Sequence, residues 1–338
     1  MLRTIRDHSV GADDITVMST LSGRSAAYDA GLIARAAGVI LRAERSLMVH
    51  VHLADRGAYL RDPPLAALAR ARGLRVVISV HGHNFPDFAH RHPGIVKAAL
   101  TQAQHVICLS DDATRAAALA VGPDRVTQLP NPIEVDRDAP AASETEPVVL
   151  FAGVVGRRKG VDVLIAAWRR LLERGIDARC RIVGPLDDYR PPALERLTVE
   201  GPADPRSIRE LVRGARVVTL PSRSEQLPMV LTEAIAMARP FVATPVGGIP
   251  SLAVSDHMLV HVDDPDALAG AIARYLTDPA LAALDGARAQ AFCAATRSTE
   301  VVGGRYRAIY ENCRSAGPTP VGGRARSRSA RRRATTLG

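Results

Sequence analysis

Two glutamates, Glu225 and Glu233, stand eight positions apart in the stretch SRSEQLPMVLTEAIAMARP, with Pro228 between them. The apolar run RVVTLPS comes just before and predicts a buried strand over 216–222. Proline is tolerated in the first turn of a helix, where its missing N–H costs nothing, so a helix is predicted over 228–238. Glu225 then lies in the loop at the helix start, and Glu233 about one and a half turns inside the helix.

The two carboxylates suit a ligand with phosphate in its middle and hydroxyl groups at both ends. Carboxylates accept hydrogen bonds from hydroxyls, whereas the free N–H groups at a helix start favour anions. Both side chains can face the carboxyl ends of the strands, where open α/β sheets bind ligands. A nucleotide sugar fits this description. Taken alone, the two residues favour a simpler interpretation, in which Glu225 is a helix-start acid and Glu233 lies on a solvated face.

A second segment, LFAGVVGRRKGVDVLIAAW (150–168), is typical of a strand, a glycine-containing turn and a helix. Lys159 lies in the turn, flanked by Arg157, Arg158 and Gly160. Cations at a strand-to-helix turn can hold a diphosphate. The turn is neither a Walker loop nor a clean G-x-G-x-x-G, so by itself it is weak support for a nucleotide site.

Short apolar runs alternate with Ala-, Leu- and Arg-rich stretches, which predicts parallel, doubly wound sheets covered by helices. In the first half, strands are predicted over 15–20, 47–53, 75–81 and 105–110, and helices over 27–45 and 61–72. In the second half, the predicted strands are 148–154, 179–184, 196–201, 216–222, 240–245 and 257–263, and the predicted helices are 160–174, 206–214, 228–238 and 264–278. The stretch 129–147 between the halves is rich in Pro, Ala, Ser and acids and predicts a linker.

The 338 residues suit two domains of ordinary size. The predicted organisation is a first α/β domain, a linker, a second α/β domain, a closing helix and a disordered basic tail. These cover residues 1–135, 136–147, 148–296, 297–314 and 315–338 in turn.

Charge, cysteines and apolar runs narrow the class of protein. The formal net charge is +9, but the last 18 residues carry six arginines and no acid, so the body carries 9 − 6 = +3. No cysteines form a C-x-x-C pair, which argues against a disulfide framework or a zinc knuckle and suits a reducing compartment. No apolar run approaches 18 residues, and the first 14 residues lack the apolar centre of a signal peptide, so we expect neither a membrane span nor secretion.

The two segments together, in this order and spacing, resemble the retaining glycosyltransferases of the GT-B fold, specifically glycosyltransferase family 4. The resemblance covers about residues 15–312 and is carried by GVVGRRKG, LPSRSEQLPMVLTEAIAMARPFVATPVGGIP and HVDDPDALAGAI. VHVHLADRGAYLR, ISVHGHNFPDF and LPNPIEVD are similar, less specifically, to a bacterial exopolysaccharide-type branch. The resemblance to the GT-B glycosyltransferases implies two Rossmann-like domains that face a cleft.

The resemblance also implies roles. Glu233 would hold the ribose hydroxyls of the nucleotide, Glu225 the hydroxyls of the transferred sugar, and Lys159 the departing diphosphate. His81, in the HG after the third predicted strand, would contact the sugar from the first domain. Other donor-binding residues would be Gly153, Arg158, Gln226, Leu227, Pro228, Met229 and Val230.

The implied reaction moves a sugar from a UDP- or GDP-sugar to a glycan or lipid-linked acceptor, with retention, in cell-surface polysaccharide synthesis. Neither a metal ion nor another cofactor is implied, because basic side chains and a helix N-terminus do the work of magnesium. No enzyme nucleophile is implied, since the donor phosphate accepts the acceptor's proton in a front-face attack. The expected location is the cytoplasm, with or without contact with the inner face of the plasma membrane.

Three departures from the family pattern stand out. Val154 follows Gly153 where the family has an arginine shortly after the strand, and Gln226 replaces a glycine after the first glutamate. The family also opens with an apolar strand, whereas 15–20 reads as its second strand and nothing before it supplies the first. Either the coding start lies further upstream, or the first domain is shortened.

Two further features have alternative interpretations. Six of ten histidines lie between His50 and His92, but no cysteine or spaced carboxylate completes a zinc site, so substrate-cleft or structural histidines are favoured. The arginine tail lacks aromatic residues for base stacking, so nucleic acid is not expected as a partner. Arginines on the helix before SLMVHVH suit either an acidic membrane surface or a solvated face: Arg35, Arg42 and Arg45.

Two alternatives to a retaining glycosyltransferase follow from these observations. One is another GT-B enzyme, such as a nucleotide-sugar epimerase; a phosphorylase is disfavoured because only Lys97 and Lys159 could hold pyridoxal phosphate. The other is a truncated, non-catalytic relative that binds nucleotide, which the absence of a first strand motivates.

Overall fold

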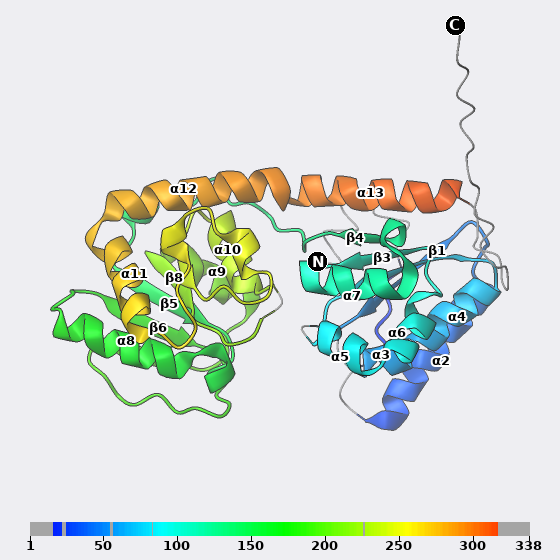
Figure 1. Cartoon of the computed structure of the whole chain (residues 1–338), viewed down its shortest axis with the longest axis horizontal. Helices are drawn as coiled ribbons and strands as arrows, with labels where there is room; N and C mark the ends of the chain where they lie inside the picture. The colour runs from blue at the N-terminus through cyan, green and yellow to red at the C-terminus, as the bar shows by residue number, and fades with distance from the viewer. Residues whose placement is uncertain (1–15, 22–24, 55–56, 83, 226, 317–338) are drawn as a thin grey trace, which may run out of the picture.

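Two parallel β-sheets organise the computed structural model, which describes residues 16–21, 25–54, 57–82, 84–225 and 227–316 (Figure 1). The first sheet has the order β1-β2-β3-β4 and the second the order β7-β6-β5-β8-β9, and every pair is parallel. The strands are β1 Met48–Leu53, β2 Arg75–Val80, β3 His105–Cys108, β4 Val126–Gln128, β5 Val148–Ala152, β6 Arg179–Val183, β7 Leu197–Glu200, β8 Val217–Leu220 and β9 Phe241–Ala243.

The first sheet follows the order of the sequence, so within the described residues β1 lies at its edge. The predicted strand 15–20 is wrong over its described part, since residues 16–20 belong to no strand. A strand needs a paired neighbour for its backbone groups, and 16–20 has none in this sheet. The predicted absence of an earlier strand concerns residues 1–14, which lie outside the described residues.

The order of the second sheet reverses between β5 and β8, which begin its two halves. Open α/β sheets bind ligands at such a reversal, beside the carboxyl ends of the strands. The predicted strand 257–263 is wrong, because this segment holds the 3-10 turn Asp256–Met258 and a single bridge between Ala243 and Leu259. A strand needs several consecutive paired residues, and this segment has one paired residue after the turn.

Helices fill the connections between strands (Figure 1). In the first half they are α2 Ala26–Arg42, α3 Ala58–Arg61, α4 Pro63–Ala71, α5 Phe85–Arg91, α6 Pro93–Leu100 and α7 Asp111–Val121. In the second half they are α8 Val161–Glu173, α9 Pro205–Gly214, α10 Met229–Ala236, α11 Pro265–Thr277, α12 Pro279–Thr296 and α13 Thr299–Ser315. α13 ends at Ser315, the first residue of the predicted tail, and residues 317–338 lie outside the described residues.

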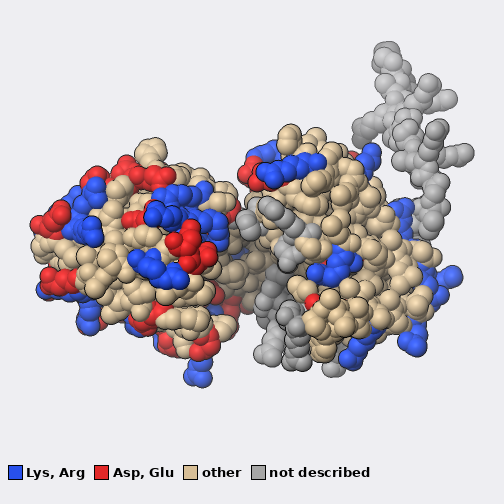
Figure 2. All heavy atoms as spheres, turned by 90° about the horizontal axis from the view of Figure 1, so that it is seen from below, with Lys and Arg blue, Asp and Glu red and all other residues tan. Residues whose placement is uncertain are grey.

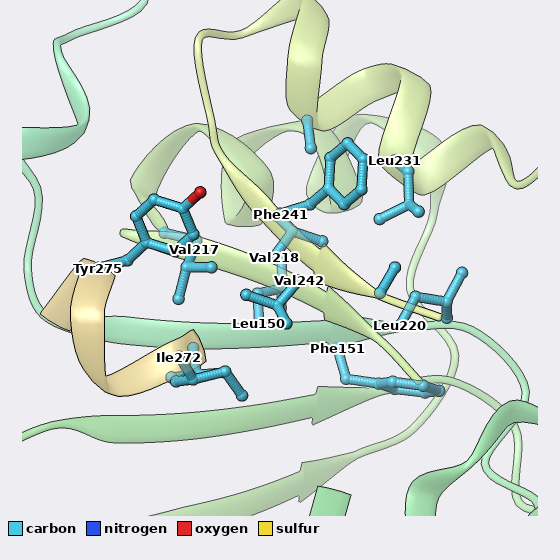
Figure 3. Packing of buried hydrophobic residues seen from close by; sticks show 14 of the residues in the cluster. Leu150, Phe151, Val217, Val218, Leu220, Leu231, Phe241, Val242, Ile272 and Tyr275 are labelled. Atoms are coloured by element: carbon cyan, nitrogen blue, oxygen red, sulfur yellow. The ribbon is translucent and has the colours of Figure 1, made fainter. Parts of the chain in front are cut away.

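The core of the second sheet is built from aliphatic side chains and a few large rings (Figure 3). Leu150, Val218 and Phe241 come from β5, β8 and β9 and are fully buried, as expected for strands covered on both faces. Trp168 on α8 is also fully buried, and its indole N–H donates to the Glu195 carbonyl at 3.0 Å. This packing gives the loops at the strand ends a rigid base.

The C-terminal helices run across both sheets (Figure 1). α12 packs on the second domain, whereas α13 places Tyr306 and Tyr310 against Val77 and Ile107 of the first sheet. At the crossing, Ile133 of the linker exchanges backbone hydrogen bonds with residues 297 and 299 at 3.0 and 3.1 Å. The two passages between domains therefore lie side by side, and Figure 2 shows a hollow between the domains.

None of the described helices has the length and apolar character that a membrane span needs. All four cysteines are buried and free of disulfide bonds.

Candidate active site

A tight turn joins β5 to α8 and carries the lysine that the sequence singles out. Residues Arg157–Lys159 form a 3-10 turn, and Gly160 ends it with φ of 70° and ψ of 24°, a left-handed conformation that glycine adopts without strain. A Cβ at Gly160 would overlap the carbonyl oxygen of Pro221. Only glycine therefore lets this turn approach the end of β8.

The loop after β8 carries the first glutamate. Ser222 is fully buried, and its hydroxyl donates to Oε1 of Glu225 at 2.8 Å. The Thr244 hydroxyl donates to the Ser222 carbonyl. Pro228 is the N-cap of α10, so the helix begins at Met229, one position later than predicted. The carboxylate of Glu225 is thus fixed by Ser222 after β8, which is itself fixed by Thr244 after β9.

Lys159 and Glu225 form a direct ion pair between Nζ and Oε1. Their side chains are 15% and 8% exposed, so the pair is largely shielded from water. The sequence predicts both residues for the site but not their contact, since 66 positions separate them. In the free protein, the cation expected to meet a diphosphate is neutralised by the carboxylate expected to meet a sugar.

Arg223 clamps the two loops together, and sequence reasoning missed it. Its guanidinium donates to both carboxylate oxygens of Asp162 at 2.9 Å and lies 2.6 Å from Oδ1 of Asp263. Its backbone N–H donates to the Arg158 carbonyl at 2.9 Å, and it also donates to the carbonyl of Arg157. The turn with Lys159 and the loop with Glu225 are therefore one rigid platform. The signal that could have found Arg223 is its position two residues before Glu225.

Exchanging Gly160 for alanine should destabilise the protein far more than exchanging Gly175. The two glycines have nearly equal φ, 70° and 69°, but a Cβ at Gly175 meets nothing within 4 Å. Gly175→Ala should cost about 1–2 kcal/mol, the usual penalty for a left-handed residue with a side chain. Gly160→Ala adds the overlap with Pro221 and should lose several-fold more. Urea unfolding of both variants measures the difference, and equal losses would contradict the close approach.

Glu233 lies inside α10 and is only partly exposed. Burial raises the pKa of its carboxyl, and the positive charge of Arg209 opposes that rise. Such a carboxylate gains from hydroxyl groups that would replace the water it has lost.

The remaining predicted donor residues cluster around the same loops. Leu227 is buried and packs into the core of the second domain, Met229 is 39% exposed at the start of α10, and Val230 is partly buried. Gly153 follows β5, and its carbonyl lies against Gly184. Gln226 lies outside the described residues. Arg158 donates to the Ser224 carbonyl at 3.2 Å, which orients it toward the loop of Glu225.

Histidines gather at the carboxyl end of the first sheet, where His81 directly follows β2. Nε2 of His81 lies 2.9 Å from Nδ1 of His52, and the rings of His50 and His52 stack with centroids 4.2 Å apart. Burial lowers the pKa of all three, to about 4 for His81, to about 3 for His52 and well below 6.5 for His50. Nearby imidazoles add to the lowering for His50 and His52. All three rings are therefore neutral at pH 7.

This cluster should make the fold sensitive to acid. Below pH 6.5 the histidines bind protons in the unfolded chain but stay neutral in the folded protein. The free energy of unfolding therefore decreases as the pH falls. Relative to a His52→Asn variant, the wild-type protein should lose about 2 kcal/mol more between pH 7.5 and 4.5, since one pKa unit is about 1.4 kcal/mol. Urea unfolding of both proteins at the two pH values measures this, and parallel losses would show that His52 is not buried as a neutral ring.

Among the residues that the structure covers, no three His, Cys, Asp or Glu side chains are placed to hold a metal ion.

The chain is similar to known glycosyltransferases. Residues 146–278 match a family model described as Glycosyl transferases group 1. Alpha-D-kanosaminyltransferase of Streptomyces kanamyceticus is 28% identical over 310 residues, covering 80% of this chain and 78% of that protein. D-inositol 3-phosphate glycosyltransferase 1 of Catenulispora acidiphila is 29% identical over 315 residues, covering 79% and 74%.

Solved structures share the fold over most of the chain. Anabaena HepE, in complex with UDP and glucose, has a TM-score of 0.65 at 16% identity and covers 88% of this chain and 86% of its own. Sucrose-phosphate synthase of Thermosynechococcus elongatus has a TM-score of 0.62 at 23% identity and covers 80% and 74%. The chain is a glycosyltransferase with the GT-B fold. The predicted α/β GT-B fold and the predicted glycosyltransferase class are confirmed, and the matched segment contains Lys159, Glu225 and Glu233.

Proposed function

We propose that this glycosyltransferase moves a sugar from a nucleotide-sugar donor to a glycan or lipid-linked acceptor, with retention of the anomeric configuration and without a metal ion. The observation that carries the proposal is the platform of Lys159 and Glu225 at the reversal point of the second sheet, with Glu233 on the helix that follows. Cation and carboxylates match the phosphates and hydroxyls of such a donor. Anabaena HepE, which has the same fold, was solved with UDP-glucose.

Donor binding would rearrange the platform. The diphosphate carries more negative charge than Glu225 and would take over Lys159, as a cation held in a shielded site is attracted by the larger charge. Glu225 would then be released toward the sugar hydroxyls, while Glu233 accepts hydrogen bonds from the ribose. The two roles assigned to Lys159 and Glu225 thus become successive states of one pair.

The chemistry then needs no enzyme nucleophile. The bond between the anomeric carbon and the phosphate oxygen breaks, and a bond to the acceptor oxygen forms on the same face of the sugar. The acceptor proton passes to the departing phosphate, whose charge Lys159 stabilises. His81 would contact the sugar from the first domain.

The setting of the reaction follows from the resemblance rather than from the site. A cytoplasmic enzyme would have access to nucleotide sugars, and a lipid-linked acceptor would bring it to the inner face of the plasma membrane. Arg35, Arg42 and Arg45 are positioned before β1, where they could meet an acidic lipid surface. Synthesis of a cell-surface polysaccharide is the role we propose.

Calorimetric titration of UDP, GDP and ADP in the presence of EDTA tests the proposal. One diphosphate should bind, and Glu233→Ala should weaken it at least 10-fold, because two charge-assisted hydrogen bonds to ribose are lost. Glu210→Ala removes an exposed carboxylate from the neighbouring α9 and should leave binding unchanged. Failure of all three nucleotides, or binding only after a divalent cation is restored, would overturn the proposal.

A further inference from the structure

His52 makes the only hydrogen bond to the ring of His81 that exists among the described residues. It joins Nδ1 of His52 to Nε2 of His81 at 2.9 Å, and the planes of the two rings differ by 20°, with 5.1 Å between the ring centroids. Nδ1 of His81 is therefore the ring nitrogen left for a ligand. His52 on β1 lies beside Ser79 on β2, and His81 follows Ser79 by two positions. Side chains two positions apart in an extended chain point to the same face, so both rings lie on the same side of the sheet.

His50 holds His52 in place from the other side. Its ring stacks on His52, with 4.2 Å between centroids. Both of its nitrogens are occupied, Nδ1 by the hydroxyl of Tyr310 at 2.7 Å and Nε2 by the hydroxyl of Ser79 at 2.8 Å. Tyr310 belongs to α13, so the helix that crosses from the second domain helps to fix the stack. The ring of His52 is therefore held by its stacking on His50, and His50 is itself fixed by its hydrogen bonds to Tyr310 and Ser79.

The hydrogen bond between His52 and His81 holds one proton, and each neutral ring carries one N–H in total, so two arrangements are possible. If His81 donates through Nε2–H, then His52 accepts at Nδ1 and both rings are protonated at Nε2. If His52 donates through Nδ1–H, then both rings are protonated at Nδ1. A neutral histidine side chain favours protonation at Nε2, so the first arrangement places both rings in their preferred form. Which nitrogen carries the proton is thus decided by the partner of the other nitrogen.

We propose that His52 is a positioning residue for the glycosyl transfer: it accepts the Nε2–H of His81, so that Nδ1 of His81 faces the cleft as a hydrogen-bond acceptor for a hydroxyl of the donor sugar. This proposal rests on the proposed function, in which His81 contacts that sugar. It adds the atom of His81 that makes the contact, the direction of the hydrogen bond and the residue that enforces both. A sugar hydroxyl would donate to His81, and its own oxygen would stay available to other donors.

Nuclear magnetic resonance of ¹⁵N-histidine-labelled protein tests the proposal without a substrate. Two-bond ¹H–¹⁵N spectra distinguish rings protonated at Nε2 from rings protonated at Nδ1, and the His81 signal is assigned by its loss in His81→Ala. At pH 7.5, wild-type His81 should be neutral and protonated at Nε2. His52→Leu should give a His81 ring that exchanges between both forms. His52→Asn keeps an oxygen near the position of Nδ1 and should restore the Nε2–H form.

Controls separate positioning from general disturbance of the fold. His105→Leu removes a strand histidine that is bonded to Thr127 at 2.8 Å and should leave the His81 signal unchanged. With the donor identified by nucleotide titration, His52→Leu should lower kcat/KM about 10-fold, the low end of the loss known for partners that orient metal-bound histidines, and His52→Asn should recover most of it.

Two results would overturn the role of His52: a wild-type His81 protonated at Nδ1, or a His81 signal that His52→Leu leaves unchanged. The first needs no variant, so it decides the matter even if His52→Leu does not fold. Failure of nucleotide binding has a different meaning. It would remove the proposed function, whereas the tautomer spectra would still report whether His52 sets the state of His81.

Discussion

Replacing Lys159 with alanine should lower the rate of sugar transfer about 100-fold to 1,000-fold, the loss typical when one group that stabilises developing negative charge is removed. The ammonium group is the cation that touches Glu225 in the free protein and would meet the leaving diphosphate in the reaction. Arg157 and Arg158 are held elsewhere, by Asp162 and by the Ser224 carbonyl, so they are poorly placed to replace it. Steady-state rates with the identified donor measure the effect.

The chain offers a matched control for this variant. Lys97 is the other of the two lysines in the sequence and lies exposed on α6. Lys97→Ala removes the same charge and should keep the wild-type rate within a factor of two or so, because surface charges contribute little. If Lys159→Ala retained more than about a tenth of the wild-type rate while remaining folded, the diphosphate would not be stabilised by this lysine.

Changing Glu225 to glutamine should have opposite effects on nucleotide binding and on turnover. The free carboxylate would compete with the diphosphate for Lys159, so its removal should tighten binding of the nucleoside diphosphate several-fold. The same change would weaken the hydrogen bonds that we propose the sugar hydroxyls make to Glu225, and turnover should fall at least about 100-fold. Glutamine is nearly isosteric and can still accept from Ser222, which limits damage to the loop.

Calorimetry and steady-state kinetics on the same Glu225→Gln sample test this pair of effects. A variant that loses nucleotide affinity would show that Glu225 supports the diphosphate site instead of competing with it. A variant with normal turnover would show that Glu225 does not touch the sugar. Either result would remove the exchange of partners from the proposed mechanism.

The strands that the sequence predicts well are those with an uninterrupted apolar run. VVLFA and VVTL become β5 and β8 because burial on both faces favours such runs whatever their neighbours are. β4 was missed, since its three residues, VTQ, hold a single aliphatic side chain, and its position is set by pairing with β3. HMLVHVD looks like a strand but forms a turn, because Ser255 caps a 3-10 helix there.

Helices in the first half were missed for a related reason. α5 and α6 are short and begin at or next to a proline, at Phe85 and Pro93, so neither has enough length to show a clear periodicity. In the second half, α12 was missed because it is a long, Ala-rich helix without a marked apolar face, and only its N-cap, Asp278, separates it from α11. Weak patterns of this kind are resolved by tertiary packing.

The candidate site divides in the same way. Lys159 and Glu225 were predicted from local context, a turn and a helix start. Their ion pair and the clamp of Arg223 on Asp162 join segments that are 66 and 61 positions apart, and nothing in either segment encodes the partner. Contacts that depend on which strands become neighbours in the sheet follow from the topology, which one sequence gives only in outline.

Metal-independent transfer with retention is tested most directly by the anomer that the enzyme releases from the donor. The protein is incubated with the nucleotide sugar that titration identifies, in the presence of EDTA, and ¹H NMR follows the anomeric proton of the product before the free sugar equilibrates. We expect turnover in EDTA, with the product in the same anomeric configuration as the donor. An inverted anomer, or turnover that appears only when a divalent cation is added, would contradict it.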